Sequence, residues 1–212
     1  MKKLLLFTLL IVFLCSPAYA WMSVPMCGGG VAAASCAGGS TTYVGDTATQ
    51  ASGYSFTADY MQCQLYEANC SGTFGTVSVY HSGTDTDNIK VGVFNSVYQT
   101  DLTSQHLPDV NDTQVTSSSW VTLSCNTNGG WCTSGATKLG GSAVSGTKYL
   151  LCWITDASAW VSVRSSTAGN YVYQIQSDTW GSYASPPTNL DDGNTAWAAY
   201  TPRSWSVYVT IE

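Results

Sequence analysis

The 212-residue chain carries a formal net charge of −6 at pH 7, and only 9% of its residues are charged. Its seven Lys and Arg residues are few and scattered, so no basic patch can form, which excludes nucleic acid and anionic membrane surfaces as partners. Hydrophobic residues make up 44% and aromatic residues 12% of the chain, which argues against disorder. The uncharged polar residues and the many Thr, Val, Tyr and Trp residues favour strands over helices.

Residues 1–20 have the three parts of a secretory signal peptide in the expected order. Two lysines follow the first residue, an apolar run spans 4–15, and Ala18-Tyr19-Ala20 matches an A-x-A cleavage site. A transmembrane anchor is the alternative, but the run is shorter than the ~20 residues that a spanning helix needs. We therefore expect secretion, extracellular or periplasmic, with Cys15 removed and no membrane insertion after cleavage.

The mature chain is expected to contain a short leader and one domain. Residues 21–40 are rich in Gly and Ala, and the pattern changes to short strands and turns from Thr41 onwards. The remaining 41–212 suits a single β domain, since sandwiches reach ~200 residues as one domain. Cleavage leaves five basic residues against 13 acidic ones, a net charge of −8.

Seven cysteines remain after cleavage, and export favours disulfides. Spacing along the chain predicts three short-range pairs: Cys27–Cys36, Cys63–Cys70 and Cys125–Cys132. The last pair is supported by the turn-forming Asn128-Gly129-Gly130 between its cysteines. Cys152 lies in the wholly apolar run 149–154 and is predicted to be a buried free thiol.

Short segments of alternating polarity recur along the domain and predict strands. They lie at 76–81, 89–94, 120–124, 159–164 and 203–211, and the wholly apolar run 149–154 is expected to be a buried strand. Four alternate residues of the last segment are expected to face the core, namely Trp205, Val207, Val209 and Ile211, while Ser204, Ser206, Tyr208 and Thr210 face outwards. No segment longer than ten residues keeps a helical period, so an all-β sandwich or barrel is expected.

The order of strand and turn segments resembles a known architecture. The segments are Gly45-Asp46-Thr47, Val77-Ser-Val-Tyr80, Ile89-Lys-Val-Gly-Val-Phe94, Ser119-Trp-Val-Thr-Leu123, Ser145-Gly-Thr-Lys-Tyr149 and Trp205-Ser-Val-Tyr208. Over 41–212 this order resembles jelly-roll β-sandwich domains of bacterial extracellular proteins, including carbohydrate-binding modules and concanavalin-A-like accessory domains. The resemblance implies an all-β, jelly-roll-like antiparallel β-sandwich. Because one such fold hosts many functions, it assigns no ligand residues.

Residue types that carry catalysis are sparse. The mature chain has two Glu residues, Glu67 and Glu212, and lacks both the paired acidic strand of sandwich glucanases and a Gly-x-Ser-x-Gly elbow. His81 and His106 are the only histidines, and we interpret them as surface-loop residues. We therefore expect the protein not to be an enzyme, and retain a glycan hydrolase with an Asp-based site as an alternative.

One acidic loop offers ligands for a hard cation. Asp85 and Asp87 begin like a calcium-binding loop, but Ile89 and Lys90 stand where that motif needs a ligand and Gly. Turn formation is the favoured interpretation of the two carboxylates. A structural calcium ion bound by them is left open, and no other cofactor is expected.

Aromatic residues crowd the second half of the chain and suggest a sugar-binding surface. The candidates for ligand contact are Trp180, Tyr183, Trp197, Tyr171 and Tyr173. Several aromatic residues of this half lie in turns, where rings are free to stand beside polar groups, and filling the sandwich core is the alternative role. The predicted function is a secreted, non-catalytic carbohydrate-binding domain. The alternative is a self-assembling structural subunit of an extracellular fibre, coat or surface layer.

Overall fold

The computed structural model describes Cys36 and residues 42–50, 52–84, 86–96, 112–116, 120–126, 129–157, 159–176, 182–190 and 198–212. Within this part the chain forms strands and turns and contains no helix. No helix able to cross a membrane is therefore found among these residues. The predicted signal peptide, most of the predicted leader and Cys27 lie outside the described residues.

Twelve strands follow one another along the described residues. They are β1 (Thr42–Gly45), β2 (Ser52–Phe56), β3 (Tyr60–Glu67), β4 (Gly72–His81), β5 (Asp87–Asn95), β6 (Trp120–Cys125), β7 (Gly130–Thr133), β8 (Ser142–Ala143), β9 (Lys148–Thr155), β10 (Ala159–Gln176), β11 (Ala198–Trp205) and β12 (Val207–Ile211). The pairings between them are antiparallel. The described part of the chain is therefore all-β, as its strand-favouring composition predicted.

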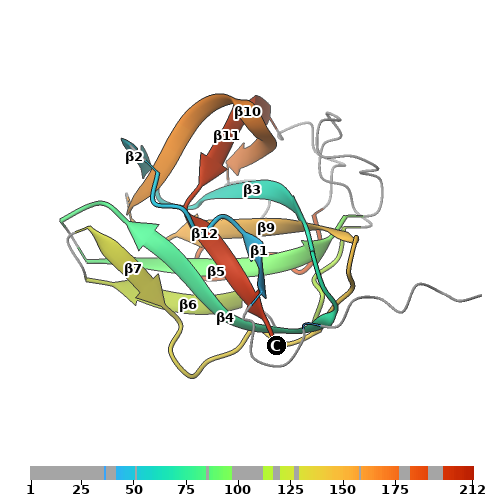
Figure 1. The fold of residues 1–212 in the computed structure, drawn as a ribbon. Helices are drawn as coiled ribbons and strands as arrows, with labels where there is room; N and C mark the ends of the chain where they lie inside the picture. The colour runs from blue at the N-terminus through green and yellow to red at the C-terminus, as the bar shows by residue number, and fades with distance from the viewer. Residues whose placement is uncertain are drawn as a thin grey trace, which may run out of the picture. The chain divides into compact units, whose positions relative to one another are not determined.

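Eight of these strands form two sheets through a nested pairing. In chain order these eight are β1, β3, β4, β5, β6, β7, β9 and β12. The first pairs with the last, the second with the second-to-last, and so on inwards: β1 with β12, β3 with β9, β4 with β7 and β5 with β6. β12 also pairs with β4, and β9 with β5, which gives the sheets β1-β12-β4-β7 and β3-β9-β5-β6. A hairpin folded over in this way is a jelly roll, so the predicted jelly-roll-like antiparallel β-sandwich is confirmed (Figure 1).

The long strand β10 connects the two sheets. Its residues 172–176 pair with β3, its residues 159–163 pair with β2, and Val161 also pairs with His81 of β4. β11 pairs back onto β10 with register shifts, and the two strands form the hairpin at the top of Figure 1. A continuous path of paired strands therefore runs from β1 to β6 through both sheets.

The space between the two sheets holds the main apolar core. Side chains alternate in direction along a strand, and alternate residues of β4, β5 and β12 are fully buried here: Val77, Val79, Ile89, Val91, Val93, Val207 and Val209. Trp153 of β9 and Trp205 at the end of β11 meet edge to face, with ring centroids 5.4 Å apart. The four residues predicted to face the core in the last strand segment are at most 1% exposed, which confirms that prediction. Ser206 and Thr210, predicted to face outwards, are buried as well, and the loop after β1 covers Ser206, whose hydroxyl donates to the Ala48 carbonyl oxygen at 2.8 Å.

The outward face of the sheet β3-β9-β5-β6 is buried as well. A second apolar cluster covers it, formed by Met61, Cys63, Leu65, Phe94, Leu150, Cys152, Ile154 and Leu190, with Trp120 and Tyr183 packed against it. Two hydrogen bonds tie residues 182–190 to this face. Lys90 Nζ donates to the Tyr183 carbonyl oxygen and Trp120 Nε1 donates to the Pro187 carbonyl oxygen, each at 2.7 Å. Burial on both faces explains why the run 149–154 is apolar throughout.

Three disulfides join Cys36 to Cys70, Cys63 to Cys152, and Cys125 to Cys132. The last was predicted correctly, and it links the end of β6 in one sheet to β7 in the other. Disulfides of this number indicate a non-reducing compartment.

The other two predicted pairs, Cys27–Cys36 and Cys63–Cys70, are wrong, and Cys152 is not a free thiol. Cys63 lies directly opposite Cys152 in the register of β3 and β9, so their side chains share one face of the sheet. Cys70 lies beyond the end of β3, where the backbone N–H of Cys36 donates to the Ser71 carbonyl oxygen at 3.2 Å. The disulfide partner of each of these cysteines is therefore set by which strands lie side by side, and not by the distance between cysteines along the chain.

Replacing Cys63 and Cys152 together by Ala should destabilise the fold more than replacing Cys125 and Cys132 together. The chain-entropy model assigns about 4–5 kcal/mol to closing the first loop, of 89 residues, and about 2 kcal/mol to closing the second, of 7 residues. Urea denaturation of both double variants, without reductant, measures the two losses. Equal losses would contradict the expected dependence on loop length.

Candidate functional site

The outward face of the sheet β1-β12-β4-β7 carries aromatic side chains from all four strands. They are Tyr43 on β1, Tyr208 on β12, Tyr80 on β4 and Trp131 on β7. The residues next to them in each strand, such as Val79 beside Tyr80, are buried in the core. Alternation along a strand therefore points these aromatic side chains away from the core.

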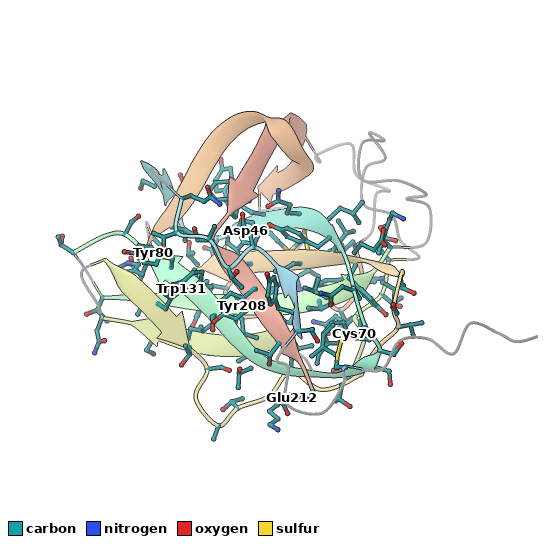
Figure 2. All side chains as sticks on the ribbon, viewed as in Figure 1. Asp46, Cys70, Tyr80, Trp131, Tyr208 and Glu212 are labelled. Atoms are coloured by element: carbon teal, nitrogen blue, oxygen red, sulfur yellow. A yellow bond between two sulfur atoms is a disulfide. The ribbon has the colours of Figure 1, made fainter. Side chains whose placement is uncertain are left out.

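These four rings form a continuous series, here called the aromatic row. Ring centroids are 5.5 Å apart for Tyr80 and Trp131, 5.1 Å for Trp131 and Tyr208, and 5.9 Å for Tyr208 and Tyr43. The ring planes are inclined at 85°, 66° and 61°, so each pair meets edge to face, an arrangement that aromatic quadrupoles favour. Tyr43 is 38% exposed and the other three are half-buried. Figure 2 shows Tyr80, Trp131 and Tyr208 one after another across the sheet.

Small residues beside Tyr208 make room for the aromatic row. Ser78 lies opposite both Tyr208 and Thr133, faces outwards, and is nevertheless only 2% exposed, which places it beneath the neighbouring side chains. Gly45 lies opposite Tyr208 on the other side with a φ of 122°. A Cβ at this glycine would stand 2.2 Å from the Val207 carbonyl oxygen and 2.9 Å from Tyr208 Cβ. A larger residue there would displace the backbone that holds Tyr208.

Hydroxyl groups flank the aromatic row. The hydroxyl oxygens of Thr76 on β4 and Thr210 on β12 are 3.3 Å apart, and the backbone N–H of Thr76 donates to the Thr210 hydroxyl at 2.8 Å. Thr133 on β7 is exposed. Thr210 is only 9% exposed, so its hydroxyl serves the contact with Thr76. Hydroxyls both donate and accept hydrogen bonds, so those of Thr76 and Thr133 can match a polyhydroxylated ligand.

Asp46, the residue that follows β1, carries a carboxylate that hydrogen bonds hold in place. Asp46 is fixed by its backbone N–H, which donates to the Val207 carbonyl oxygen at 2.9 Å. Its Oδ1 accepts from the Ala48 backbone N–H at 2.8 Å, and its Oδ2 accepts from Gln50 Nε2 at 2.6 Å. A carboxylate oxygen can accept more than one hydrogen bond, so both oxygens retain capacity for a ligand hydroxyl. Asp46 is labelled above the aromatic row in Figure 2.

The face itself is uncharged. The strands β1, β4, β7 and β12 contain no Lys, Arg, Asp or Glu, and their one histidine, His81, is fully buried. Asp46 follows β1 directly and Glu212 follows β12, where Glu212 pairs with Lys138. The aromatic row is therefore a neutral surface with acidic residues at the ends of two of its strands.

Among the aromatic residues predicted from the sequence as ligand contacts, Tyr183 is the one whose side chain the structure describes. Tyr183 packs on the outward face of the other sheet, with Lys90 Nζ 4.5 Å from its ring centroid and Asp59 Oδ1 accepting from its backbone N–H at 2.7 Å. Burial, together with the negative charge of Asp156, raises the pKa of the Tyr183 phenol. The other four candidates have no described side chain and stay a prediction: Tyr171, Tyr173, Trp180 and Trp197.

The structure pairs Asp87, one of the two predicted calcium ligands, with a histidine inside the protein. His81 Nε2 and Asp87 Oδ2 are 2.6 Å apart, and both side chains are at most 3% exposed. The interpretation of His81 as a surface-loop residue is therefore wrong, because β4 extends to His81 and β5 begins at Asp87, so both ends of the turn are buried. No cluster of three metal-binding side chains occurs within the described ranges. Asp85 and His106 lie outside those ranges, and the calcium site stays a prediction.

The aromatic row was not predicted as a unit, although Trp131 belongs to the aromatic-rich half of the chain and Tyr208 was expected to face outwards. Tyr43 and Tyr80 lie in the first half of the chain and reach the row through pairings of β1 with β12 and of β4 with β7. A local sequence pattern could have predicted that these aromatic side chains face outwards. Each aromatic residue stands beside a buried Val or Cys in its own strand, which marks it as outward-facing.

Comparison with known proteins does not assign the chain to a family. No protein-family model matches the chain, and a comparison with curated proteins finds no significant match. The site is therefore interpreted from its own geometry and chemistry.

Gly45→Ala should destabilise the protein and loosen the aromatic row. Two effects combine, namely a positive φ, which costs a non-glycine residue roughly 1–2 kcal/mol, and the clash with the Val207 carbonyl oxygen. Gly135→Ala is the matched control, because Gly135 has a φ of 60° and no atom within 4 Å of an added Cβ. Urea denaturation should give a clearly larger loss for Gly45→Ala. Equal losses would show that the strand backbone yields without strain.

A second polar group of side chains lies inside the sandwich. The hydroxyl of Tyr66, which is 9% exposed, donates to Gln64 Oε1 at 2.5 Å. Burial of this phenol raises its pKa above the ordinary value of 10, and the negative charge of Asp46 raises it further. The Tyr66 hydroxyl therefore stays protonated and acts as a structural hydrogen-bond donor.

The free energy of unfolding should fall above pH 10, and Tyr66→Phe should weaken that fall. Because the folded-state pKa of Tyr66 is raised, its contribution is complete below pH 10 and is lost as the unfolded phenol ionises, by up to about 1.4 kcal/mol per pH unit. At pH 8, Tyr66→Phe should lose about 1 kcal/mol with the hydrogen bond. Urea denaturation from pH 8 to about 11 measures both effects, with Tyr43→Phe as the exposed control. Parallel pH profiles for wild type and Tyr66→Phe would contradict this assignment.

Proposed function

We propose that the chain is a secreted, non-catalytic binding domain that holds carbohydrate against the aromatic row. The observation that carries the proposal is the unbroken contact of Tyr80, Trp131, Tyr208 and Tyr43 across four strands of one outward face. A contiguous apolar patch on the outward face of a sheet marks an interaction or ligand-binding surface.

The chemistry of the face suits a sugar. The C–H groups on one side of a sugar ring are apolar and weakly positive, so they pack against the negative face of an aromatic ring. The sugar hydroxyls then need hydrogen-bonding partners. Thr133 supplies an exposed hydroxyl and Thr76 a half-buried one, and Asp46 supplies a fixed acceptor after β1. Apolar contact with a few placed polar groups is the general form of a small-molecule site.

Trp131 is the residue on which the proposal is tested. It contacts Tyr80 on one side and Tyr208 on the other, so its removal interrupts the aromatic row at its middle. Trp131→Ala should weaken binding to a glycan found by array screening by about tenfold or more, because a stacking ring and its buried area are both lost. Affinity electrophoresis and tryptophan fluorescence titration measure the change, and far-UV circular dichroism checks the fold.

Tyr183→Ala is the matched control, because Tyr183 is an aromatic residue on the other sheet. It should bind glycan as the wild type does. If Tyr183→Ala loses binding and Trp131→Ala keeps it, the loop aromatics are the site and the aromatic row is not. If the wild type binds no glycan across a broad panel, the proposal is wrong. Ordered polymers in electron microscopy that Trp131→Ala abolishes would assign the row to self-assembly instead.

A further inference from the structure

We infer that the aromatic row takes single, soluble chains of uncharged sugars, and takes neither anionic glycans nor the flat surface of a crystalline polysaccharide. This inference rests on the proposed function and narrows its ligand class. Three features of the face carry it: its charge, the angles between its rings and its length.

Charge excludes anionic glycans. The four strands that form the face hold no Lys or Arg, so none of them supplies a cation to pair with a uronate or a sulfate. The carboxylates of Asp46 and Glu212 stand at the ends of two of these strands, and Lys138 is already paired with Glu212. A like charge near a ligand costs affinity, and nothing on this face offsets it.

Ring geometry excludes a crystalline surface. A flat crystal face can stack only on rings that lie in one plane. Neighbouring rings of the aromatic row are inclined at 61° to 85°, so no two neighbours can lie flat against the same plane. A single chain is different, because each of its sugar units can turn about the glycosidic bond to meet a ring of its own orientation.

The length of the row sets a minimum size for the ligand. Four adjacent strands span about 14 Å at roughly 4.8 Å per strand spacing. Consecutive ring centroids are 5.1–5.9 Å apart, so a ligand that meets all four rings must contain several linked sugar units. Affinity should therefore rise with chain length before it levels off.

The test compares three classes of glycan under the same buffer. Isothermal titration uses soluble neutral polysaccharides, such as hydroxyethyl cellulose, dextran and galactomannan, against polygalacturonate and heparin, and a pull-down uses microcrystalline cellulose and chitin. At least one soluble neutral polysaccharide should bind at least tenfold more tightly than either anionic polymer. The crystalline solids should retain no more of the wild-type protein than of the Trp131→Ala variant.

The possible results distinguish a failure of this inference from a failure of the proposed carbohydrate binding. Binding to a crystalline or anionic glycan that is lost in Trp131→Ala keeps the proposed function and overturns the inference. No binding to any glycan rejects the proposed function itself. A soluble neutral ligand bound equally well as a single sugar and as an oligomer would overturn the argument from length.

A gain of function tests the charge argument directly. Thr133 is exposed on β7 and lies two residues after Trp131, on the same face of the strand, so Thr133→Lys adds a cation to the face. Its affinity for polygalacturonate should exceed that of the neutral control Thr133→Gln by about fivefold at low salt, and the gain should disappear near 1 M salt. Equal affinities of the two variants at low salt would show that charge does not select the ligand.

Discussion

The apolar side chains between the two sheets hold the domain together, and Trp153 and Trp205 meet edge to face among them. Alternation along a strand links this burial to the opposite face. Because Val79 and Val207 are buried, Tyr80 and Tyr208 must point outwards. A slip of one residue would bury the rings and expose the valines, at a large loss of apolar burial. The core therefore enforces the orientation of the aromatic row.

The two sheets use their outward faces differently. In β3-β9-β5-β6 the outward face is covered by a second apolar cluster and by residues 182–190, which Lys90 and Trp120 hold through hydrogen bonds. In β1-β12-β4-β7 the outward face carries aromatic and hydroxyl side chains without charge. One sheet thus serves mainly as a buried support. The other presents a surface whose rings are positioned by the packing beneath them, which lowers the entropy lost when a ligand is bound.

The cysteines show why nearness along the chain misleads in a sandwich. Cys63 and Cys70 lie seven residues apart, but the chain leaves its sheet between them and Cys63 meets Cys152 across β3 and β9. Cys125 and Cys132 do pair, because the short connection from β6 to β7 keeps two cysteines that are seven residues apart within reach of each other. The same contrast applies to the aromatic residues. Tyr208 could be assigned its outward direction from alternation, but its contact with Trp131 depends on two strand pairings.

The amino-acid sequence by itself determined the all-β class, the approximate strands and the inward face of residues 205–211, because these follow from local backbone preference and a period of two. The order of its strand and turn segments also indicated the jelly roll. Only the tertiary structure decided which strands are neighbours, and with them the partners of Cys63 and Cys36, the burial of His81 and the aromatic row. The physical reason is that register between strands distant in sequence is set by packing over the whole core, and no local pattern of residues records it.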